Sequence, residues 1–548
     1  MGSISNTNGT LPFSLKDTPV ENHRPMKVVI IGAGFSGIYT TIRISQRLKN
    51  IDLTVYEMND EVAGVWWLNR YPGLACDIPS YCYQYSFAPN PYWSSLYAPG
   101  PEIRKYLQDV AERYGATRFI KTSHKVETTT WDAEKKLWRI VVTNRITGET
   151  FEHTADIVIS ARGGLNQIAW PDIKGLKSFD GKLIHSGAWD ESYDLRNKRV
   201  GVIGNGSSAI QIVPAIQPLE GLKLWTFARS PTWITAAFGD MAMVKLGMDP
   251  ANTKCVGTKE QVDATTFFEQ KMREKLDGRE DIFTTMLPKF AAGCRRLTPG
   301  PGYLEALKKD NVEFISTPIN EITTRGIKLA SGEEVELDVI VCATGYDVEA
   351  PPLFEVIGRN GTTLANRWKP QIESYLALAV DQFPNFLIVG GPGSGLGSGS
   401  LVSVFEAQGD YVVKAIRKMQ KEDYATIEIK PERVADFSQY IDEYFKNTVY
   451  TDECSSWYRQ GKKGARIVAL WPGSSAQCLE VLRSPRWEDY RFESADPTGN
   501  RLRWLGNGWS TVLKEGDASW FLDDDVVDKP EEGKPEEGEK YDRRPFSY

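Results

Sequence analysis

The chain has 548 residues and a formal net charge of −7, with 41% hydrophobic and 25% charged residues. This length predicts two to four domains, because a single hydrophobic core rarely extends beyond about 250–300 residues. Residues 523–542 contain ten acids and three lysines, which account for the whole net charge, so the rest of the chain is close to neutral. The composition therefore argues against a nucleic-acid-binding surface and against a polybasic membrane patch.

The cysteines and the apolar runs indicate the environment of the protein. Seven cysteines are scattered along the chain and include no C-x-x-C pair, which argues against a disulfide framework and against a zinc site. The polar N-terminus lacks the apolar segment of a secretory signal, and no apolar run reaches the roughly 18–20 residues of a membrane-spanning helix. We therefore expect a cytoplasmic protein without a metal site, as a monomer or a weak homo-oligomer.

The first predicted unit follows a polar lead, residues 1–25, which we expect to be a disordered tail. Between Lys27 and Glu57, an apolar strand, a glycine-rich turn, a helix over 35–49 and a second strand follow one another. This succession is typical of one half of a dinucleotide-binding fold. A glycine-rich turn alone would be weak evidence, but the strands on either side complete the pattern.

The residues of this turn each have a physical role. Gly32 permits the tight bend, Gly34 lets the backbone approach a pyrophosphate, and Gly37 lets the helix pack closely on the strand. Phe35 and Ser36 begin the helix, whose free N–H groups favour an anion. We therefore expect these five residues to bind the pyrophosphate of a dinucleotide.

An aromatic-rich segment follows at residues 66–99, with ten aromatic side chains. A solvated loop would not carry so many, so we expect an ordered loop packed around a flat apolar ring system, with Asp77 as its main acid. A purely structural aromatic cluster is the alternative for this composition. The residues that we expect to contact the first dinucleotide here and in the next strand are Val65, Trp66, Asp77, Tyr83 and Val126.

A second copy of the strand–turn–helix–strand pattern runs from Arg199 to Arg229. Its turn carries an alanine where the first copy has its third glycine, and a helix again begins directly after the turn. The residues of this turn that we expect to bind a second dinucleotide are Gly204, Gly206, Ser207, Ser208 and Ala209.

The strand ends of the two copies differ in charge, and this difference assigns the cofactors. Glu57 and Arg229 each lie 25 positions after the first glycine of their turn. The Glu57 carboxylate can accept both ribose hydroxyls of FAD or NAD but would repel a 2′-phosphate. The Arg229 guanidinium would bind that phosphate, and Ser230 would add a hydroxyl. We expect FAD on the first copy and NADPH on the second, with a solvated surface charge as the alternative for Arg229.

These patterns predict an α/β fold with two Rossmann-like dinucleotide-binding domains and an inserted helical segment. We expect the NADP-binding domain to be inserted into a discontinuous FAD-binding domain, and a helical segment with few β-branched runs to be inserted into the NADP-binding domain. The expected ranges are 26–160 and 376–522 for the FAD-binding domain, 161–231 and 293–375 for the NADP-binding domain, 232–292 for the helical insertion and 523–548 for a disordered acidic tail.

A specific motif precedes the second turn. The segment FDGKLIHSGAWD at 179–190 resembles the F-x-G-x-x-x-H-x-x-x-W-[P/D] fingerprint of Baeyer–Villiger monooxygenases. Other segments similar to landmarks of that family lie at 63–77, 293–297 and 339–347, and the resemblance extends over roughly residues 26–490. The matching fingerprint residues are Phe179, Gly181, His185, Trp189 and Asp190.

The resemblance implies that NADPH reduces FAD and that a flavin C4a-peroxide, formed with O2, inserts one oxygen atom next to a ketone carbonyl to give an ester or lactone. It implies Arg296 as the positive charge that stabilises the peroxide, and Asp77 as the acid that orients this arginine. Arg295 would join Arg229 on the 2′-phosphate. We expect no nucleic-acid or membrane partner, only a small ketone and O2.

Two further residues take their expected roles from the resemblance. Trp457 is similar to a tryptophan that contacts NADP, and His185 to a histidine that links domain movement to cofactor binding rather than acting as a base. An ordinary core histidine is the alternative for His185. The residues after Trp457 depart from the usual G-A-N-I-P-G-K run of the family, which indicates a divergent subgroup and leaves the ketone unidentified.

Three rival functions remain to be weighed. An N- or S-oxidising flavin monooxygenase shares the fold but needs a protonated peroxide, and Trp189, Asp190 and the Asp77–Arg296 pair favour ketone oxidation. A pyridine-nucleotide disulfide reductase would need a C-x-x-C pair, which the chain lacks. A non-enzymatic NADPH sensor would not need two intact glycine-rich turns with charged strand ends.

Overall fold

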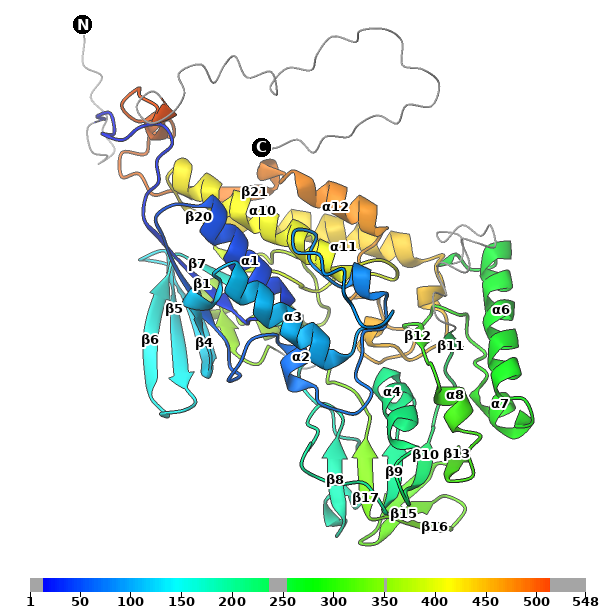
Figure 1. Cartoon of the computed structure of the whole chain (residues 1–548). Coiled ribbons are helices and arrows are strands. Elements are labelled where there is room, and N and C mark those ends of the chain that lie inside the picture. The colour runs from blue at the N-terminus through cyan, green and yellow to red at the C-terminus, as the bar shows by residue number, and fades with distance from the viewer. Residues whose placement is uncertain (1–12, 236–253, 349–351, 513–548) are drawn as a thin grey trace, which may run out of the picture.

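The structure is a computed structural model that describes residues 13–235, 254–348 and 352–512, and Figure 1 shows their arrangement. Two parallel five-stranded sheets form the frame, with the strand orders β19-β7-β1-β2-β3 and β13-β10-β9-β17-β8. In each sheet the central strand, β1 or β9, leads directly into a glycine-rich turn. The expected α/β fold with two dinucleotide-binding domains is confirmed.

The central strands of the first sheet, β1 and β7, are mostly apolar, as is typical of parallel strands that are covered on both faces. In β1, every residue except Lys27 is buried. Helix α10 packs against α1 so closely that a Cβ at Gly409 would lie 2.6 Å from the Tyr39 ring. The elements are β1 (Met26–Ile31), α1 (Phe35–Arg47), β2 (Ile51–Tyr56), α2 (Val65–Leu68), α3 (Gly100–Arg113), β3 (Ile120–Lys121), β7 (Ile157–Ser160), β19 (Phe386–Ile388), α10 (Leu401–Lys421), β20 (Tyr424–Ile429), α11 (Pro431–Phe445), α12 (Ser475–Arg483) and β21 (Tyr490–Ser494).

The second sheet has its own apolar core, formed by β9, β10, β17 and the helices around α4. Figure 1 shows α6 and α7 beside this domain, as the described part of the expected helical insertion. Its elements are β8 (Lys182–His185), β9 (Arg199–Ile203), α4 (Ser207–Ile216), β10 (Lys223–Phe227), β11 (Ile234–Thr235), α6 (Lys259–Lys275), α7 (Glu280–Met286), β12 (Thr298–Pro299), α8 (Tyr303–Ala306), β13 (Val312–Ile315), β14 (Ile319–Ile322), β15 (Gly326–Leu329), β16 (Glu334–Glu336) and β17 (Val339–Cys342).

A smaller sheet, β18-β4-β5-β6, packs against the first sheet. Strand β18 pairs with β4 in parallel, so residues 355–357 lie in the first domain and not, as we expected, in the second. The chain thus returns to the first domain earlier than the predicted boundary at 376. The elements are β4 (His124–Asp132), β5 (Leu137–Asn144), β6 (Thr150–Ala155), β18 (Glu355–Ile357) and α9 (Leu364–Arg367).

Short 3-10 helices occupy several connections between these elements. They are η1 (Ser80–Cys82), η2 (Thr117–Phe119), η3 (Leu176–Ser178), η5 (Arg359–Gly361), η6 (Val449–Thr451), η7 (Trp457–Arg459), η8 (Trp487–Asp489) and η9 (Arg503–Leu505).

The end of the polar lead is ordered, which corrects the expectation of disorder for residues 13–25. Lys16 forms an ion pair with Asp423 at 2.6 Å, and the Asn22 amide donates to the same carboxylate at 2.9 Å. The Glu21 carboxylate accepts a hydrogen bond from the backbone N–H of Thr511 at 2.9 Å. These contacts join the lead to the last described segment of the chain. Residues 1–12 and the acidic tail, 523–548, lie outside the described residues.

Candidate active site between the two dinucleotide turns

The first glycine-rich turn has the geometry of a pyrophosphate cradle. Gly32 has a φ of +103°, and a Cβ there would lie 2.7 Å from the carbonyl oxygen of Ala161. A Cβ at Gly37 would lie 1.9 Å from the carbonyl oxygen of Gly32. Gly34 precedes α1, with space beside it that extends to Gly64 at 3.7 Å. The turn therefore requires glycine at both ends and leaves the helix N-terminus open to an anion.

Glu57 lies where a ribose-binding carboxylate is expected, directly after β2. Its side chain is 4% exposed and accepts hydrogen bonds from the backbone N–H groups of Ala33 and Asn59 at 2.8 and 2.9 Å. Burial raises the pKa of Glu57, and these hydrogen bonds oppose that shift by favouring the carboxylate. The contacts hold the acid against the turn, beside the expected ribose.

Aromatic rings from the segment after β2 pack on the start of α1. The Phe35 ring contacts the Tyr83 ring with centroids 5.1 Å apart, and the Trp66 indole N–H donates to the Tyr83 hydroxyl at 3.2 Å. Val65 begins the short helix α2 on this segment. Val126 is buried in β4, at a β-bulge opposite β5 and outside this aromatic group. The structure thus brings together four of the five expected contacts around the turn, Val126 lying apart on the next sheet.

The second turn repeats the geometry of the first. Gly204 has a φ of +118°, and a Cβ there would lie 2.5 Å from the carbonyl oxygen of Ala343. A Cβ at Gly206 would meet nothing within 4 Å, so the backbone at this position faces open space. Ser207 shares a hydrogen bond with Thr298 at 2.8 Å, and Ala209 is fully buried against the sheet. This turn also fits the pyrophosphate of a dinucleotide.

Two arginines lie near each other beside the second turn, and within the described residues neither forms an ion pair with a carboxylate. Arg229 lies two residues after the end of β10 and is exposed, and Arg295 lies over the Phe290 ring with its guanidinium carbon 5.1 Å from the ring centroid. Burial lowers the pKa of Arg295, and the charge of Arg229 lowers it further. Ser230 lies next to Arg229, held by the Asn205 amide. Such a pair of cations fits a doubly charged phosphate, the group that distinguishes NADP from NAD.

Asp77 and Arg296 form a bidentate ion pair that joins the two domains. Arg296 Nε and Nη2 lie 2.9 and 2.8 Å from the two carboxylate oxygens of Asp77, and each side chain is about a quarter exposed. Asp77 belongs to the aromatic-rich segment of the first domain, whereas Arg296 lies in the loop between α7 and β12. The charge of Arg296 lowers the pKa of Asp77, and the charge of Asp77 raises the pKa of Arg296, so both remain charged.

Two tyrosines complete the surroundings of this ion pair. Tyr458 is buried, and its hydroxyl oxygen accepts a hydrogen bond from the Arg296 guanidinium. Burial raises the pKa of Tyr458 to about 12, although the arginine opposes the shift. Tyr83 lies on the other side, close to Asp77. Trp457 precedes Tyr458, and their rings contact edge to face at 4.6 Å. The sequence motif identified Trp457, but nothing in its pattern singled out Tyr458.

A disulfide connects the loop of Arg296 to the segment of Trp457. Cys294 and Cys454 are bonded, 160 residues apart in sequence, with their Cα atoms 6.3 Å apart. The backbone N–H of Ala291 also donates to the Asp452 carboxylate at 2.7 Å. The cysteine spacing argued against disulfides, and this bond corrects that expectation for one pair. Spacing alone could not reveal it, because the two cysteines come together only through the tertiary fold.

The fingerprint residues lie at the edge of the second sheet. A Cβ at Gly181 would lie 2.5 Å from the Phe179 ring, which explains the glycine at this position. The Asp190 carboxylate forms an ion pair with Lys182 at 2.5 Å, which lowers the pKa of Asp190 to about 2. Trp189 is partly buried against the core of the same domain. These residues fold the fingerprint onto β8, and within the described residues they form no hydrogen bond or ion pair with Asp77 or Arg296.

His185 lies next to the two segments of chain that connect the domains. These connections pair with each other, since the Ala169 N–H donates to the Gly345 carbonyl at 3.0 Å. His185 is buried, accepts from the Gly187 N–H at its Nδ1, and presents its Nε2 to the Ala169 carbonyl at 3.3 Å. Burial lowers the pKa of His185, so the ring is neutral at neutral pH. This position agrees with a histidine at a hinge between the two domains. The expected link between His185 and domain movement stays a prediction.

Contacts between the domains continue along α4. The Tyr71 hydroxyl donates to the Gln211 side chain at 2.9 Å, and the Gln211 amide donates to the carbonyl of Ala75 at 3.0 Å. The hydroxyl of Tyr71 also interacts with Ser208, one of the residues expected at the second turn. These contacts seat the aromatic-rich segment on the helix of the second turn. Sequence patterns did not identify Tyr71 or Gln211, because their partners lie about 140 residues away.

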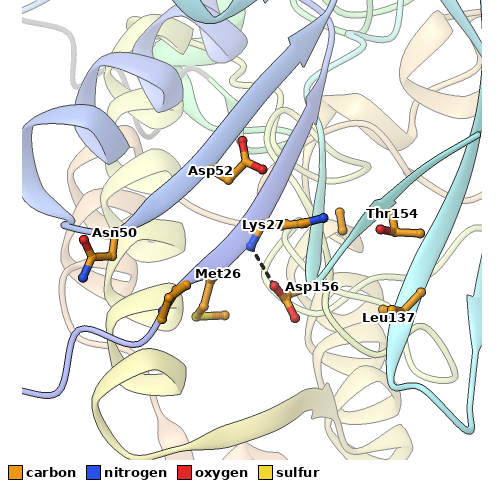
Figure 2. Close-up of a pocket in the computed structure, with 9 residues that line it drawn as sticks. Met26, Lys27, Asn50, Asp52, Leu137, Thr154 and Asp156 are labelled. Carbon is orange, nitrogen blue, oxygen red and sulfur yellow. Dashed lines mark hydrogen bonds between the residues drawn. The ribbon is translucent and has the colours of Figure 1, made fainter. Parts of the chain in front are cut away.

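A separate pocket of about 410 Å³ lies at the opposite ends of the strands of the first sheet. Figure 2 shows it near Met26, Lys27 and Asp156, where the Lys27 backbone N–H donates to the Asp156 carboxylate at 2.7 Å. It opens at the amino ends of β1 and β2, whereas nucleotides bind at the carboxyl ends of parallel strands. We therefore assign it no part in the candidate site.

Comparisons with known proteins agree with this geometry. Residues 25–438 match the Flavin-binding monooxygenase-like family. The chain is 34% identical over 543 residues to the FAD-binding monooxygenase tazF of Aspergillus terreus, covering 92% of this chain and 96% of that protein. It is 35% identical over 493 residues to a Baeyer–Villiger monooxygenase of Streptomyces coelicolor, covering 86% and 93%. An oxidised steroid monooxygenase bound to NADP has a TM-score of 0.75 and 29% identity, covering 86% and 100%.

The chain belongs to the flavin-binding monooxygenase-like family. This membership confirms the expected resemblance and the expected flavin cofactor, and the NADP-bound neighbour agrees with the expected pair of FAD and NADP. In the described part of the chain, no helix has the length and apolar character needed to cross a membrane, and no cluster of three or more potential metal ligands occurs.

Proposed function

We propose that this flavin monooxygenase uses NADPH and O2 to insert one oxygen atom next to a ketone carbonyl, giving an ester or lactone. The observation that carries the proposal is the Asp77–Arg296 pair, which holds a permanent positive charge between the two dinucleotide turns. FAD bound at the first turn would supply reducing equivalents from NADPH and activated oxygen. The residues of the chain then determine which substrate that oxygen attacks.

Arg296 is assigned the role of stabilising negative charge on oxygen. Attack on a ketone carbonyl places a negative charge on the carbonyl oxygen, and a preorganised cation in a partly dehydrated site stabilises it much more than water does. Asp77 fixes the direction of the guanidinium through two hydrogen bonds, so little reorganisation is needed during the reaction. The raised pKa of Arg296 keeps it charged throughout, which excludes a role as a proton donor.

The cofactor assignment follows from the two strand ends. Glu57 offers a carboxylate to the ribose at the first turn, which favours FAD there. Arg229 and Arg295 offer two cations at the second turn, which favours the 2′-phosphate of NADPH. Ser230 and Trp457 are assigned to the same nucleotide, and the fingerprint with His185 to the coupling between nucleotide binding and domain movement.

Replacement of Arg296 by alanine tests the proposal. The Arg296→Ala enzyme should still be bleached by NADPH without oxygen, because flavin reduction does not need this charge. It should form at least a hundredfold less ester than the wild type, since one preorganised donor contributes roughly 10²–10³ in rate. The measurements are anaerobic flavin reduction and product mass with linear, cyclic and polycyclic ketones. Arg295→Ala is the matched control, and it should raise the KM for NADPH while ester still forms.

The same screen decides between ketone oxidation and heteroatom oxidation. A thioether is included beside the ketones, because an N- or S-oxidising enzyme would convert it through a protonated oxygen species. Ester formation that requires Arg296 supports the proposal. Sulfoxide formation without any ester, or a normal ester yield from Arg296→Ala, would contradict it.

A further inference from the structure

The two dinucleotide turns differ at one equivalent position beside the cofactor. Strands β7 and β17 occupy the same place in the two sheets, next to β1 and β9. They end in Ala161-Arg162-Gly163 and Ala343-Thr344-Gly345. The carbonyl oxygen of each alanine meets the first glycine of its turn, at 2.7 and 2.5 Å from a Cβ placed there. Arg162 and Thr344 therefore occupy corresponding positions, and the first domain carries a cation where the second has a hydroxyl.

The hydroxyl of Thr344 has a partner in the protein, whereas the guanidinium of Arg162 has none among the residues that the structure describes. Thr344 donates to the Ala169 carbonyl at 2.7 Å. The Arg162 side chain makes no hydrogen bond or ion pair with any residue in the described ranges, although its backbone carbonyl accepts from the Asn166 amide at 2.7 Å. Burial alone lowers the pKa of Arg162 to about 10. A partly buried cation without a counter-charge is costly, so proteins keep it where an anion binds.

The backbone of Arg162 lies in the crevice where the first dinucleotide is expected to bind. Its Cα would lie 3.2 Å from a Cβ at Gly32, and the Ser36 hydroxyl donates to the adjacent Ala161 carbonyl at 3.4 Å. Strands β1, β7 and β19 all end here, and ligands of doubly wound sheets bind outside the carboxyl ends of such strands. The turn itself, from Gly32 to Gly37, contains no charged side chain. Arg162 supplies the positive charge that this turn lacks.

We propose that Arg162 binds the pyrophosphate of FAD and is a cofactor-retaining residue of the first domain. The role deepens the proposed function, because it rests on the assignment of FAD to the first turn. A guanidinium can hold two phosphate oxygens at once, in addition to the backbone N–H groups at the start of α1. At the second turn the corresponding position is Thr344, and the cations assigned to that nucleotide, Arg229 and Arg295, are placed at its 2′-phosphate.

The test measures the retention of FAD by the holoenzyme. Arg162→Gln keeps a polar side chain without the charge, and Arg162→Lys keeps the charge without the planar, two-pronged guanidinium. Free FAD is measured by fluorescence after ultrafiltration over a range of protein concentrations. Arg162→Gln should weaken FAD binding roughly ten- to hundredfold, as expected for loss of a charged hydrogen bond, and Arg162→Lys should recover most of the loss. Arg47→Gln, an exposed arginine at the other end of α1, should bind FAD like the wild type.

A second readout distinguishes the phosphates from the flavin ring. The midpoint potential of the flavin is measured with saturating FAD, and it should be the same in all variants if Arg162 contacts the pyrophosphate. Unchanged FAD affinity in Arg162→Gln, or equal weakening in Arg162→Lys, would overturn the proposal. A changed potential with unchanged affinity would also overturn it, because that result would indicate that Arg162 contacts the flavin ring and not the pyrophosphate. Both the FAD affinity and the midpoint potential are measured independently of ester formation. Failure of the proposed reaction can therefore be distinguished from failure of this proposal.

Discussion

At the scale of single residues, the site depends on charges that the fold holds in fixed states. The Asp77–Arg296 pair is charged because each partner shifts the pKa of the other toward ionisation. The Arg229–Arg295 pair is the opposite case, since burial and the like charge of Arg229 both lower the pKa of Arg295. One pair is neutralised within the protein, and the other would be neutralised by the 2′-phosphate that we propose binds there.

Replacing Asp77 by asparagine should leave Arg296 charged but poorly oriented. We expect ester formation to fall about tenfold or more while anaerobic flavin reduction persists. Loss of one partner of a buried ion pair costs about 3–5 kcal/mol, and the partial exposure of this pair reduces the expected loss of stability to about 2 kcal/mol. The measurements are ester yield and chemical unfolding at pH 7, with Asp77→Glu as the control that retains the charge.

The stability difference between wild type and Asp77→Asn should also depend on pH. The folded-state pKa of Asp77 is lowered from 3.8, so its contribution is present above pH 3.8 and is lost as the pH falls through the folded-state pKa. The two proteins should therefore differ fully at pH 7 and converge in strong acid. A difference that stays constant down to pH 3 would show that the charge of Asp77 is not the cause.

At the scale of elements, the Cys294–Cys454 disulfide and the segment of residues 13–25 fix the positions of connecting loops. The loop of Arg296 has few residues in regular structure between α7 and β12, and its position depends on Cys294–Cys454 and on the Ala291–Asp452 hydrogen bond. The same bond fixes η7, which carries Trp457 and Tyr458. Covalent attachment thus positions Arg296 relative to a segment more than 150 residues later in the chain.

Cys454→Ser should therefore loosen the Arg296 loop. A disulfide that closes a long loop contributes about 2–4 kcal/mol, so unfolding should occur at lower denaturant concentration than in the wild type. Reductant should destabilise the wild type to the same level and leave Cys454→Ser unchanged. Thiol titration of the unfolded, unreduced wild type should count five free cysteines. Cys82→Ser is the matched control, and a count of seven thiols would contradict the bond.

How far the sequence predicts this structure differs from element to element. The two turns were predictable because a φ above +100° at Gly32 and Gly204 and the close contact at Gly37 leave only glycine possible. The disulfide and the Tyr458–Arg296 contact were not, because their partners meet only in the tertiary fold. Strand β18 was misassigned because a three-residue strand has no periodicity of its own to indicate which sheet it joins. The order of residues 13–25 depends on contacts with Asp423 and Thr511, which composition does not encode.

At the scale of the whole molecule, two paired connections join the domains and His185 lies beneath them. The ring is neutral in the folded protein, and it can gain a proton only at the expense of its contacts with the Ala169 carbonyl and the Gly187 N–H. A protonated ring would offer two donors where the Gly187 N–H also donates. The contacts that His185 makes with these connections should therefore weaken in mild acid.

The pH dependence of unfolding tests this expectation. The folded-state pKa of His185 is lowered, so the unfolded state binds more protons below pH 6.5 and stability falls as the pH drops, by at most about 1.4 kcal/mol per pH unit. His185→Gln should lose this component, so its stability should decline less than that of the wild type between pH 7.5 and 5.5. His124→Gln, at a histidine outside the hinge, is the control. Parallel decline of wild type and His185→Gln would exclude His185 as the source.

The position of β19 has a consequence for the synthesis of the protein. This strand supplies one edge of the first sheet beside β7, yet it is made more than 200 residues after β7, when the whole second domain has already left the ribosome. The second domain is continuous between its two connections and can fold as soon as it emerges. We expect the nascent chain to acquire its NADP-binding half first, and the site for FAD, although begun earlier, to be completed last.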